Sequence, residues 1–165
     1  MLKYKKMKSL LILLSTISPA LCACQNLTYT EVVSADSSSK DLLYSNAKEW
    51  FVHAFNSANN VIQYDSKDEG KLIGKGNFTF HGKAFTSGTS STGPVTFTIT
   101  IEVKDNKYKY TLTDFDHESF GLVPQTEPKG MMKVANRDLW KDCNKEATAM
   151  IADLKKAMIK TKSNF

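Results

Sequence analysis

The strongest constraint in the sequence is a strict alternation of apolar and polar residues between positions 95 and 103. The apolar members are Val95, Phe97, Ile99, Ile101 and Val103. A period of two over a run of this length predicts a β-strand with one buried face. Asp105-Asn106 follows directly and has the residue types of a two-residue turn. The segment 94–116 is therefore predicted to form a β-hairpin.

The turn at Asp105-Asn106 also predicts the register of the hairpin. With Lys104 opposite Lys107, the apolar face pairs Val103 with Tyr108, Ile101 with Tyr110, and Ile99 with Leu112. The other face pairs Glu102 with Lys109, Thr100 with Thr111, and Thr98 with Thr113. Cross-strand pairs of this kind each contribute a few tenths to about 1 kcal/mol. The register places Tyr108 and Tyr110 in the core, and not on a surface that stacks bases or sugars.

The alternation fails at Asp114. Continuing the register places this acid opposite Phe97, on the apolar face of the hairpin. Such a mismatch predicts a β-bulge, a sheet edge or a strand end at this point.

Two segments have the periodicity of amphipathic helices. The first runs from about Ser39 to Ala58, with an apolar stripe of Leu43, Ala47, Trp50, Phe51, Ala54 and Ala58. The second runs from about Arg137 to Lys160, with a stripe of Leu139, Cys143, Ala147, Met150, Ile151, Leu154 and Met158. The place of Cys143 on this stripe predicts a buried thiol.

Three further strands are predicted, over 27–33, 61–64 and 71–81, from β-rich residues between turn residues. Gly74 and Gly76 lie on the apolar face of the last of these strands, which predicts that a helix packs very close to it. The fold class is therefore α+β, with an antiparallel sheet of about five strands and two helices on one face. The predicted order is β-α-β-β-β-β-α in a single domain over 27–165.

Residues 1–23 have the order of a secretory signal peptide. Four lysines, at positions 3, 5, 6 and 8, precede an apolar run over 10–17, and Ser18-Pro19 with small residues follows. The run is far shorter than the ~20 residues that cross a bilayer as a helix. We expect residues 1–23 to be removed and the protein to be exported to the cell envelope.

The sequence leaves two forms of cleavage open. Leu21-Cys22-Ala23-Cys24 resembles a bacterial lipobox, although Cys22 departs from the usual residue there. In that case Cys24 carries acyl chains that anchor the protein to a membrane, and residues 24–36 form the anchor and first strand. An ordinary signal peptidase that cuts after Cys22 or Ala23 would instead leave a soluble periplasmic or secreted protein, in which Cys24 could form a disulfide with Cys143. We favour lipidation of Cys24.

The charge of the chain argues against a nucleic-acid partner. The chain has 22 basic and 17 acidic residues, a net charge of +5. Because residues 1–23 contain four lysines and no acid, only +1 remains without them. A nucleic-acid-binding domain needs a basic face in the folded protein. The rest of the composition, 41% hydrophobic and 24% charged, is that of an ordinary globular chain.

Several segments together resemble a bacterial family. They are Asp41-Leu42-Leu43-Tyr44 opening a helix that reaches Trp50, then Val61-Ile62-Gln63-Tyr64-Asp65, Gly70-Lys71-Leu72-Ile73-Gly74-Lys75-Gly76 and Lys107-Tyr108-Lys109-Tyr110-Thr111-Leu112-Thr113-Asp114-Phe115. Their order over 27–116 resembles an exported domain of unknown function with a TATA-binding-protein-like fold. The resemblance implies that fold and an envelope location, and it supplies no catalytic residues.

The chain has no motif that supports catalysis or a cofactor. Gly70-x-x-x-Gly74-Lys75-Gly76 lacks the spacing of a phosphate-binding loop and the Ser or Thr after its Lys. Asp114, Asp116, His117 and Glu118 offer oxygen and imidazole ligands for a metal, but a solvated strand end is the simpler interpretation. We expect no catalytic residue, no cofactor and no metal.

Two surfaces remain as candidates for binding. The irregular segment 119–137 contains apolar residues, and long loops of this kind often bind ligands. The polar face of the sheet is the second surface. The candidate contacts are Phe120, Leu122, Met131 and Met132 in the segment and Lys109 on the sheet.

These surfaces lead to three functional hypotheses. The first is a non-catalytic envelope lipoprotein that binds a protein or an apolar small ligand between the sheet, the helices and segment 119–137. The second is a structural or surface-interaction module that uses the polar sheet face and takes no small ligand. The third is a hydrolase that uses Asp114, Asp116 or His117.

Overall fold

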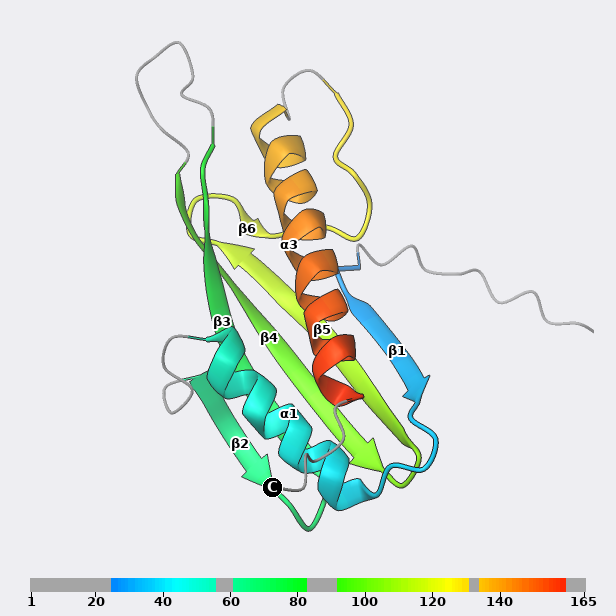
Figure 1. Ribbon diagram of the computed structural model, residues 1–165. Helices are drawn as coiled ribbons and strands as arrows, with labels where there is room; N and C mark the ends of the chain where they lie inside the picture. The colour runs from blue at the N-terminus through cyan, green and yellow to red at the C-terminus, as the bar shows by residue number, and fades with distance from the viewer. Residues whose placement is uncertain (1–24, 56–60, 83–91, 131–133, 160–165) are drawn as a thin grey trace, which may run out of the picture.

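The computed structural model describes residues 25–55, 61–82, 92–130 and 134–159. Its helices and strands follow one another in the predicted order (Figure 1). The elements are β1 (Tyr29–Ser34), α1 (Lys40–Ala54), β2 (Ile62–Ser66), β3 (Lys71–Phe80), β4 (Gly93–Lys104), β5 (Lys107–His117), β6 (Gly121–Leu122) and α3 (Val134–Met158). The α+β class is confirmed, with one addition. The short strand β6 lies between β5 and α3, so that the sheet has six strands.

The ends of α1 follow from local hydrogen bonding. The Ser39 side chain accepts a hydrogen bond from the Leu42 N–H at 3.2 Å, as an N-cap residue does. The helix ends at Ala54 because Phe55 is extended, with φ −127° and ψ 136°. The prediction that this helix continues to Ala58 was therefore too long, and Ala58 itself lies outside the described residues.

The strands form one antiparallel sheet in the order β1-β5-β4-β3-β2, with β6 paired to β5. The predicted hairpin is β4 and β5, at the centre of the sheet. Its register is the predicted one from Lys104 opposite Lys107 through to Thr98 opposite Thr113. The hairpin is therefore the part of the fold that local sequence specifies best.

The predicted irregularity at Asp114 is a β-bulge. Thr98 pairs with Thr113 but Thr96 pairs with Asp116, so Phe97 lies opposite two residues of β5. Asp114 adopts a left-handed conformation with φ +57° and stays exposed. The extra residue resets the alternation, and Phe115 enters the core and stacks on Phe97 with ring centroids 5.5 Å apart.

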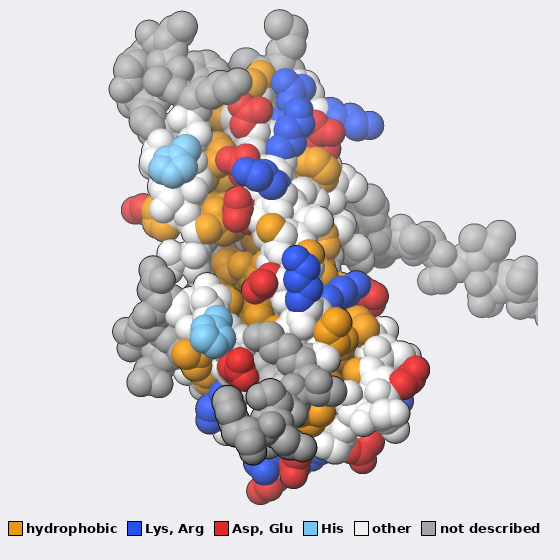
Figure 2. All heavy atoms as spheres, in the orientation of Figure 1, with side chains coloured by type: hydrophobic (Ala, Val, Ile, Leu, Met, Phe, Trp, Pro, Cys, Tyr) orange, Lys and Arg blue, Asp and Glu red, His pale blue; other side chains and the backbone are white. Residues whose placement is uncertain are grey.

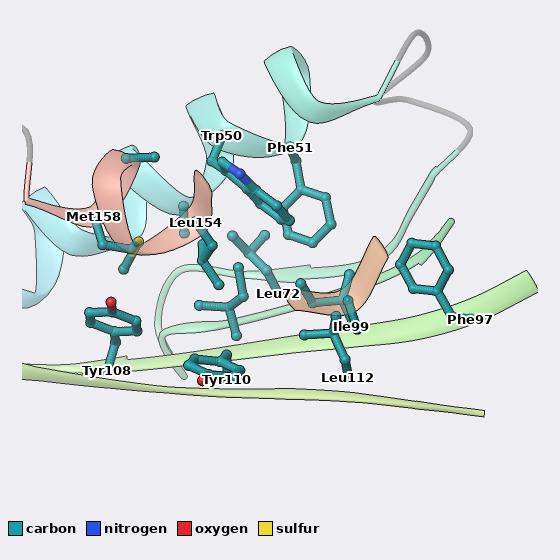
Figure 3. Packing of buried hydrophobic residues seen from close by; sticks show 14 of the residues in the cluster. Trp50, Phe51, Leu72, Phe97, Ile99, Tyr108, Tyr110, Leu112, Leu154 and Met158 are labelled. Carbon is teal, nitrogen blue, oxygen red and sulfur yellow. The ribbon is translucent and has the colours of Figure 1, made fainter. Parts of the chain in front are cut away.

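Both helices lie on the same face of the sheet, and the core fills the space between the layers (Figures 1 and 3). Trp50 and Phe51 of α1 and Leu154 and Met158 of α3 point down onto the strands, where Ile99, Tyr108, Tyr110 and Leu112 meet them. Tyr108 and Tyr110 are buried, as the register predicts. Cys143 is a buried free thiol on α3, also as predicted. Within the described residues, no helix combines the length and apolar character that a membrane span requires.

The two glycines of β3 lie where α1 approaches the sheet. A Cβ atom on Gly74 would lie 2.4 Å from Cε1 of Phe51. A Cβ atom on Gly76 would lie 2.6 Å from Cε1 of Phe55 and equally close to Cζ of Phe97. The close packing of a helix that these glycines predict is therefore present.

Candidate functional site

Threonine side chains cover the centre of the sheet face opposite the two helices, which we call the outer face. The rows across β1, β5 and β4 include Thr30, Thr111 and Thr100, followed by Thr113 and Thr98. The hydroxyls of Thr30 and Thr111 are 3.0 Å apart, and Thr28 makes a similar contact of 3.1 Å with Thr113. These short side chains give the outer face a flat, polar centre.

The outer face becomes basic toward the hairpin turn. Outside the bulge, its charged residues are Lys71, Lys75, Lys104, Lys107 and Lys109 against Glu102 and Asp116. By contrast, the helix side carries acidic and basic side chains interspersed (Figure 2). Among the described residues, the excess of basic over acidic side chains is therefore concentrated on the sheet face opposite α1 and α3.

A hollow of about 350 Å³ lies at this basic end. It is lined by Val32, Glu102, Lys104, Lys107, Tyr108 and Lys109. Lys109 lies 3.5 Å from Glu102 in an exposed ion pair, a kind of pair that contributes little to stability. Val32 of β1 lies opposite Lys109 of β5 and is 62% exposed. The hollow thus combines an apolar wall with cationic groups.

The other side of β1 is tied to α3 by charged hydrogen bonds. Glu31 accepts a hydrogen bond from Lys155 at 2.7 Å and another from the Tyr110 hydroxyl at 2.5 Å. Both hydrogen bonds lower the pKa of Glu31, and the bond from Lys155 has the larger effect. Burial and the same carboxylate raise the pKa of Tyr110. The group fixes the edge strand to the helix and faces away from the outer face.

A second polar group joins α1 to β2. Asp65 accepts hydrogen bonds from Lys48, at 2.6 Å, and from the Tyr44 hydroxyl. Both hydrogen bonds lower the pKa of Asp65, and the bond from Lys48 has the larger effect. The adjoining hollow of about 510 Å³ is lined by Asp41, Tyr44, Ser45, Lys48, Glu49, Val52 and Lys67. Its acids and lysines are mixed, so it shows no preference for one sign of charge.

The residues considered for a metal or for hydrolysis do not converge. Asp114, Asp116 and Glu118 are exposed, whereas His117 is buried against Phe80 and Phe120. The Nδ1 atom of His117 accepts a hydrogen bond from the Ser119 N–H at 3.1 Å. In the described part of the chain, no three His, Cys, Asp or Glu side chains are grouped to hold a metal. The alternation of side chains along β5 explains the separation, because it directs Asp116 to the outer face and His117 to the helix side.

The candidate contacts of segment 119–137 lie in different surroundings. Phe120 packs on the core, with its ring centroid 4.9 Å from that of His117. Leu122 of β6 is 51% exposed. Met131 and Met132 lie outside the described residues, as does Cys24. The structure therefore separates the segment into a core-packed residue and an exposed one, and Lys109 lies apart from both on the outer face.

Sequence reasoning missed Val32 as part of the basic end. Its position depends on which strand lies beside β5, and no local pattern gives that pairing. The alternation that places Thr30 and Val32 on the same side of β1 was the available signal.

Comparison with known proteins identifies the family. Residues 29–118 match the domain of unknown function DUF4468 with TBP-like fold. No curated protein matches the chain significantly.

Two solved structures are similar in fold. A DUF4468 family protein from Bacteroides ovatus ATCC 8483 superposes with a TM-score of 0.63 at 12% identity, over 85% of this chain and 90% of that one. A TBP-like protein from Parabacteroides distasonis ATCC 8503 gives 0.63 at 10% identity, over 83% and 95%. At these identities the likeness concerns the fold alone. Since the family match covers more than half of the sequence, the chain belongs to the DUF4468 family of domains with a TBP-like fold.

Proposed function

We propose that this protein is a non-catalytic binding module of the cell envelope, lipid-anchored through Cys24, and that its outer face binds an acidic segment of a partner protein. The observation that carries the proposal is the placement of both helices on one face, which leaves the flat opposite face, with its basic end, uncovered by any described element. A fold of this kind does not define a function by itself, so the argument rests on the chemistry of that face.

Charge supports an acidic partner. Lys104 and Lys107 lie directly opposite each other across the hairpin end, where like charges repel. An incoming carboxylate would relieve this repulsion. Interactions between exposed charges are screened within roughly 10 Å at 0.1 M salt, so binding of this kind is expected to weaken as salt is added.

The shape of the outer face supports a protein segment over a small apolar ligand. Where α1 covers β3 the two layers are in direct contact, since Gly74 and Gly76 have no room even for a methyl group. The described hollows lie at the surface and are lined by charged residues. Threonine side chains lose little conformational freedom on contact, and they offer hydroxyls to a polar partner.

The binding experiment uses a fluorescein-labelled peptide of alternating Glu and Thr as its probe. In fluorescence anisotropy, Lys107→Glu combined with Lys109→Glu is expected to weaken binding about tenfold or more. The matched control is Lys145→Glu with Lys156→Glu on exposed positions of α3, which changes net charge equally. Equal losses in the two double variants would mean that net charge alone drives binding and would contradict the proposal.

Two further measurements test location and anchoring. A photo-crosslinking residue in place of Thr100, on the outer face, should capture the peptide, whereas one in place of the exposed Val52 on α1 should not. Intact mass of the protein from its own envelope should show acyl chains on Cys24. A chain without them would remove the anchor and leave the outer-face proposal to be judged by the peptide alone.

A further inference from the structure

The first described residues are fastened to the segment that follows β6. Gln25 accepts a hydrogen bond from the Gln125 N–H at 2.7 Å, and the Leu27 N–H donates to the Val123 carbonyl at 2.7 Å. The Thr28 N–H donates to the Gln125 side chain, also at 2.7 Å. Leu27 and Val123 are both buried. The fold therefore holds the chain in place from Gln25 onward.

This fastening leaves almost no linker for a lipid anchor at Cys24. Consecutive Cα atoms are about 3.8 Å apart, so the acylated residue would lie within one residue of a hydrogen-bonded one. A domain tied this closely cannot drift from the bilayer that holds its acyl chains. The surface around Gln25 must lie near the lipid.

The residues that form this surface are uncharged, which suits a protein surface that contacts a membrane. The stretches 25–30 and 119–126 contain no Asp, Glu, Lys or Arg, in a chain of which 24% is charged. The side chains of these two stretches therefore carry no charge that the lipid would desolvate. An exposed carboxylate beside them is that of Asp116, which lies opposite Leu122 in the β5–β6 pair and stays at the headgroup level. Leu122 stands on this surface with 51% of its area exposed.

We propose that the surface formed by residues 25–27 and 121–125, which we call the anchor edge, rests on the membrane that carries the protein's own acyl chains. Leu122 enters the boundary between headgroups and acyl chains, where exposed apolar side chains of peripheral proteins lie. This inference rests on the proposed lipidation of Cys24. It adds an orientation, because a single flexible tether would leave the domain free to tumble.

The orientation separates the two functional ends of the sheet. β5 runs from Lys107 to His117, and His117 pairs with Gly121 of the anchor edge. At roughly 3.3 Å per residue, the basic turn lies about 33 Å along the strand from the anchor edge. With β5 directed away from the bilayer, these lysines lie at a distance from the lipid, where a partner protein can reach them.

The test places a fluorescent probe on the lipidated protein in vesicles of phosphatidylethanolamine and phosphatidylglycerol. Leu122→Cys is labelled with an environment-sensitive dye, and Lys107→Cys at the far end is the control. Labelling is selective because Cys143 is buried and Cys24 is blocked by its acyl group. Aqueous iodide should quench the dye at position 122 about threefold less than the dye at position 107.

A linker variant and a mass measurement separate the possible failures. A flexible insertion of about eight residues between Cys24 and Gln25 reaches roughly 16 Å and should abolish the protection at position 122. Acylated protein whose dye at position 122 is quenched as strongly as that at position 107 overturns the orientation alone. Protein without acyl mass on Cys24 overturns the anchor itself, and the orientation with it.

Discussion

The ring of Phe51 on α1 occupies the space into which a side chain at Gly74 on β3 would project. The Cε1 atom of Phe51 is 2.4 Å from the position of such a Cβ atom. Because Gly74 has no side chain, the aromatic ring of Phe51 packs directly on the backbone of β3. This contact sets how closely the helix layer approaches the sheet.

Replacing Gly74 with alanine is expected to lower the free energy of unfolding by about 1–3 kcal/mol, as overpacking of a filled core does. Urea denaturation measures the change. Lys75→Ala, at the next and exposed position, is the control and should stay within about 0.5 kcal/mol. In a Phe51→Leu background the cost of Gly74→Ala should shrink, and an unchanged cost would contradict the contact.

The turn of the hairpin caps a helix that lies far away in the sequence. Asp105 accepts a hydrogen bond from the Lys40 N–H at 2.8 Å. Asp105→Ala is therefore expected to cost about 1 kcal/mol of stability, as the loss of a cap does. Asp105→Asn keeps an acceptor and should cost less. Asp36→Ala, in the loop before α1, serves as the control in the same thermal denaturation series, and an equal effect of the two alanines would count against capping.

The bulge depends on the left-handed backbone of Asp114, with φ +57°. Asp114→Val is expected to cost about 1–2 kcal/mol because a β-branched side chain is strained there. Asp114→Gly should be neutral or stabilising, since glycine adopts this conformation freely. Urea unfolding of the two variants gives the comparison, and the opposite order of stabilities would show that the bulge has a different backbone.

The link between Glu31, Lys155 and Tyr110 should make stability depend on acid. The pKa of Glu31 is lowered in the folded protein, chiefly by the hydrogen bond from Lys155. Its contribution is therefore present above the ordinary carboxyl pKa and is lost as the pH falls through the lowered, folded-state value. Between pH 7 and pH 3, about the range in which carboxyls titrate, the melting temperature of Glu31→Gln should fall less than that of the wild type. Glu118→Gln, which removes an exposed carboxyl elsewhere in the chain, is the matched control in the same series.

The thiol of Cys143 should weaken the fold at high pH. Burial raises its pKa from 9.0 to about 12, so the thiol ionises more easily in the unfolded chain. Its contribution is complete below pH 9 and is lost as the pH rises toward 12. The stability of the wild type should fall more steeply with pH than that of Cys143→Ala, by up to about 1.4 kcal/mol per pH unit. Parallel slopes in urea titrations would falsify this assignment.

Together, the proposed anchor and the proposed binding face predict how the sheet is oriented relative to the membrane. In the proposed orientation the anchor edge rests on the lipid, and the basic end of the outer face lies about 33 Å along β5 from it. A partner with an acidic segment would then be met at a fixed height above the membrane. A linker between Cys24 and Gln25 should leave peptide binding unchanged while releasing the orientation, so the two properties can be measured separately.

The sequence by itself determined the features that depend on neighbouring residues. The alternation around Ile99 and Ile101 determined which face of the hairpin is buried, and the turn at Asp105-Asn106 determined its register. Helical periodicity identified most of the buried faces of α1 and α3, although Ala54 of the predicted stripe is exposed and the buried Tyr44 and Asn46 lay outside it. The glycines of β3 predicted the close approach of a helix. Local geometry decides these features, because the side-chain period of a strand or helix is a property of the backbone.

The tertiary structure alone decided the contacts between distant parts of the chain. These include the pairing of β1 with β5, the added strand β6, the cap that Asp105 supplies to α1, and the hydrogen bonds between Gln25 and Gln125. The basic end and the anchor edge both arise from such contacts. Several pairings of similar local quality were open to each segment. The choice among them depends on closing long loops and burying one common core, which no local pattern records.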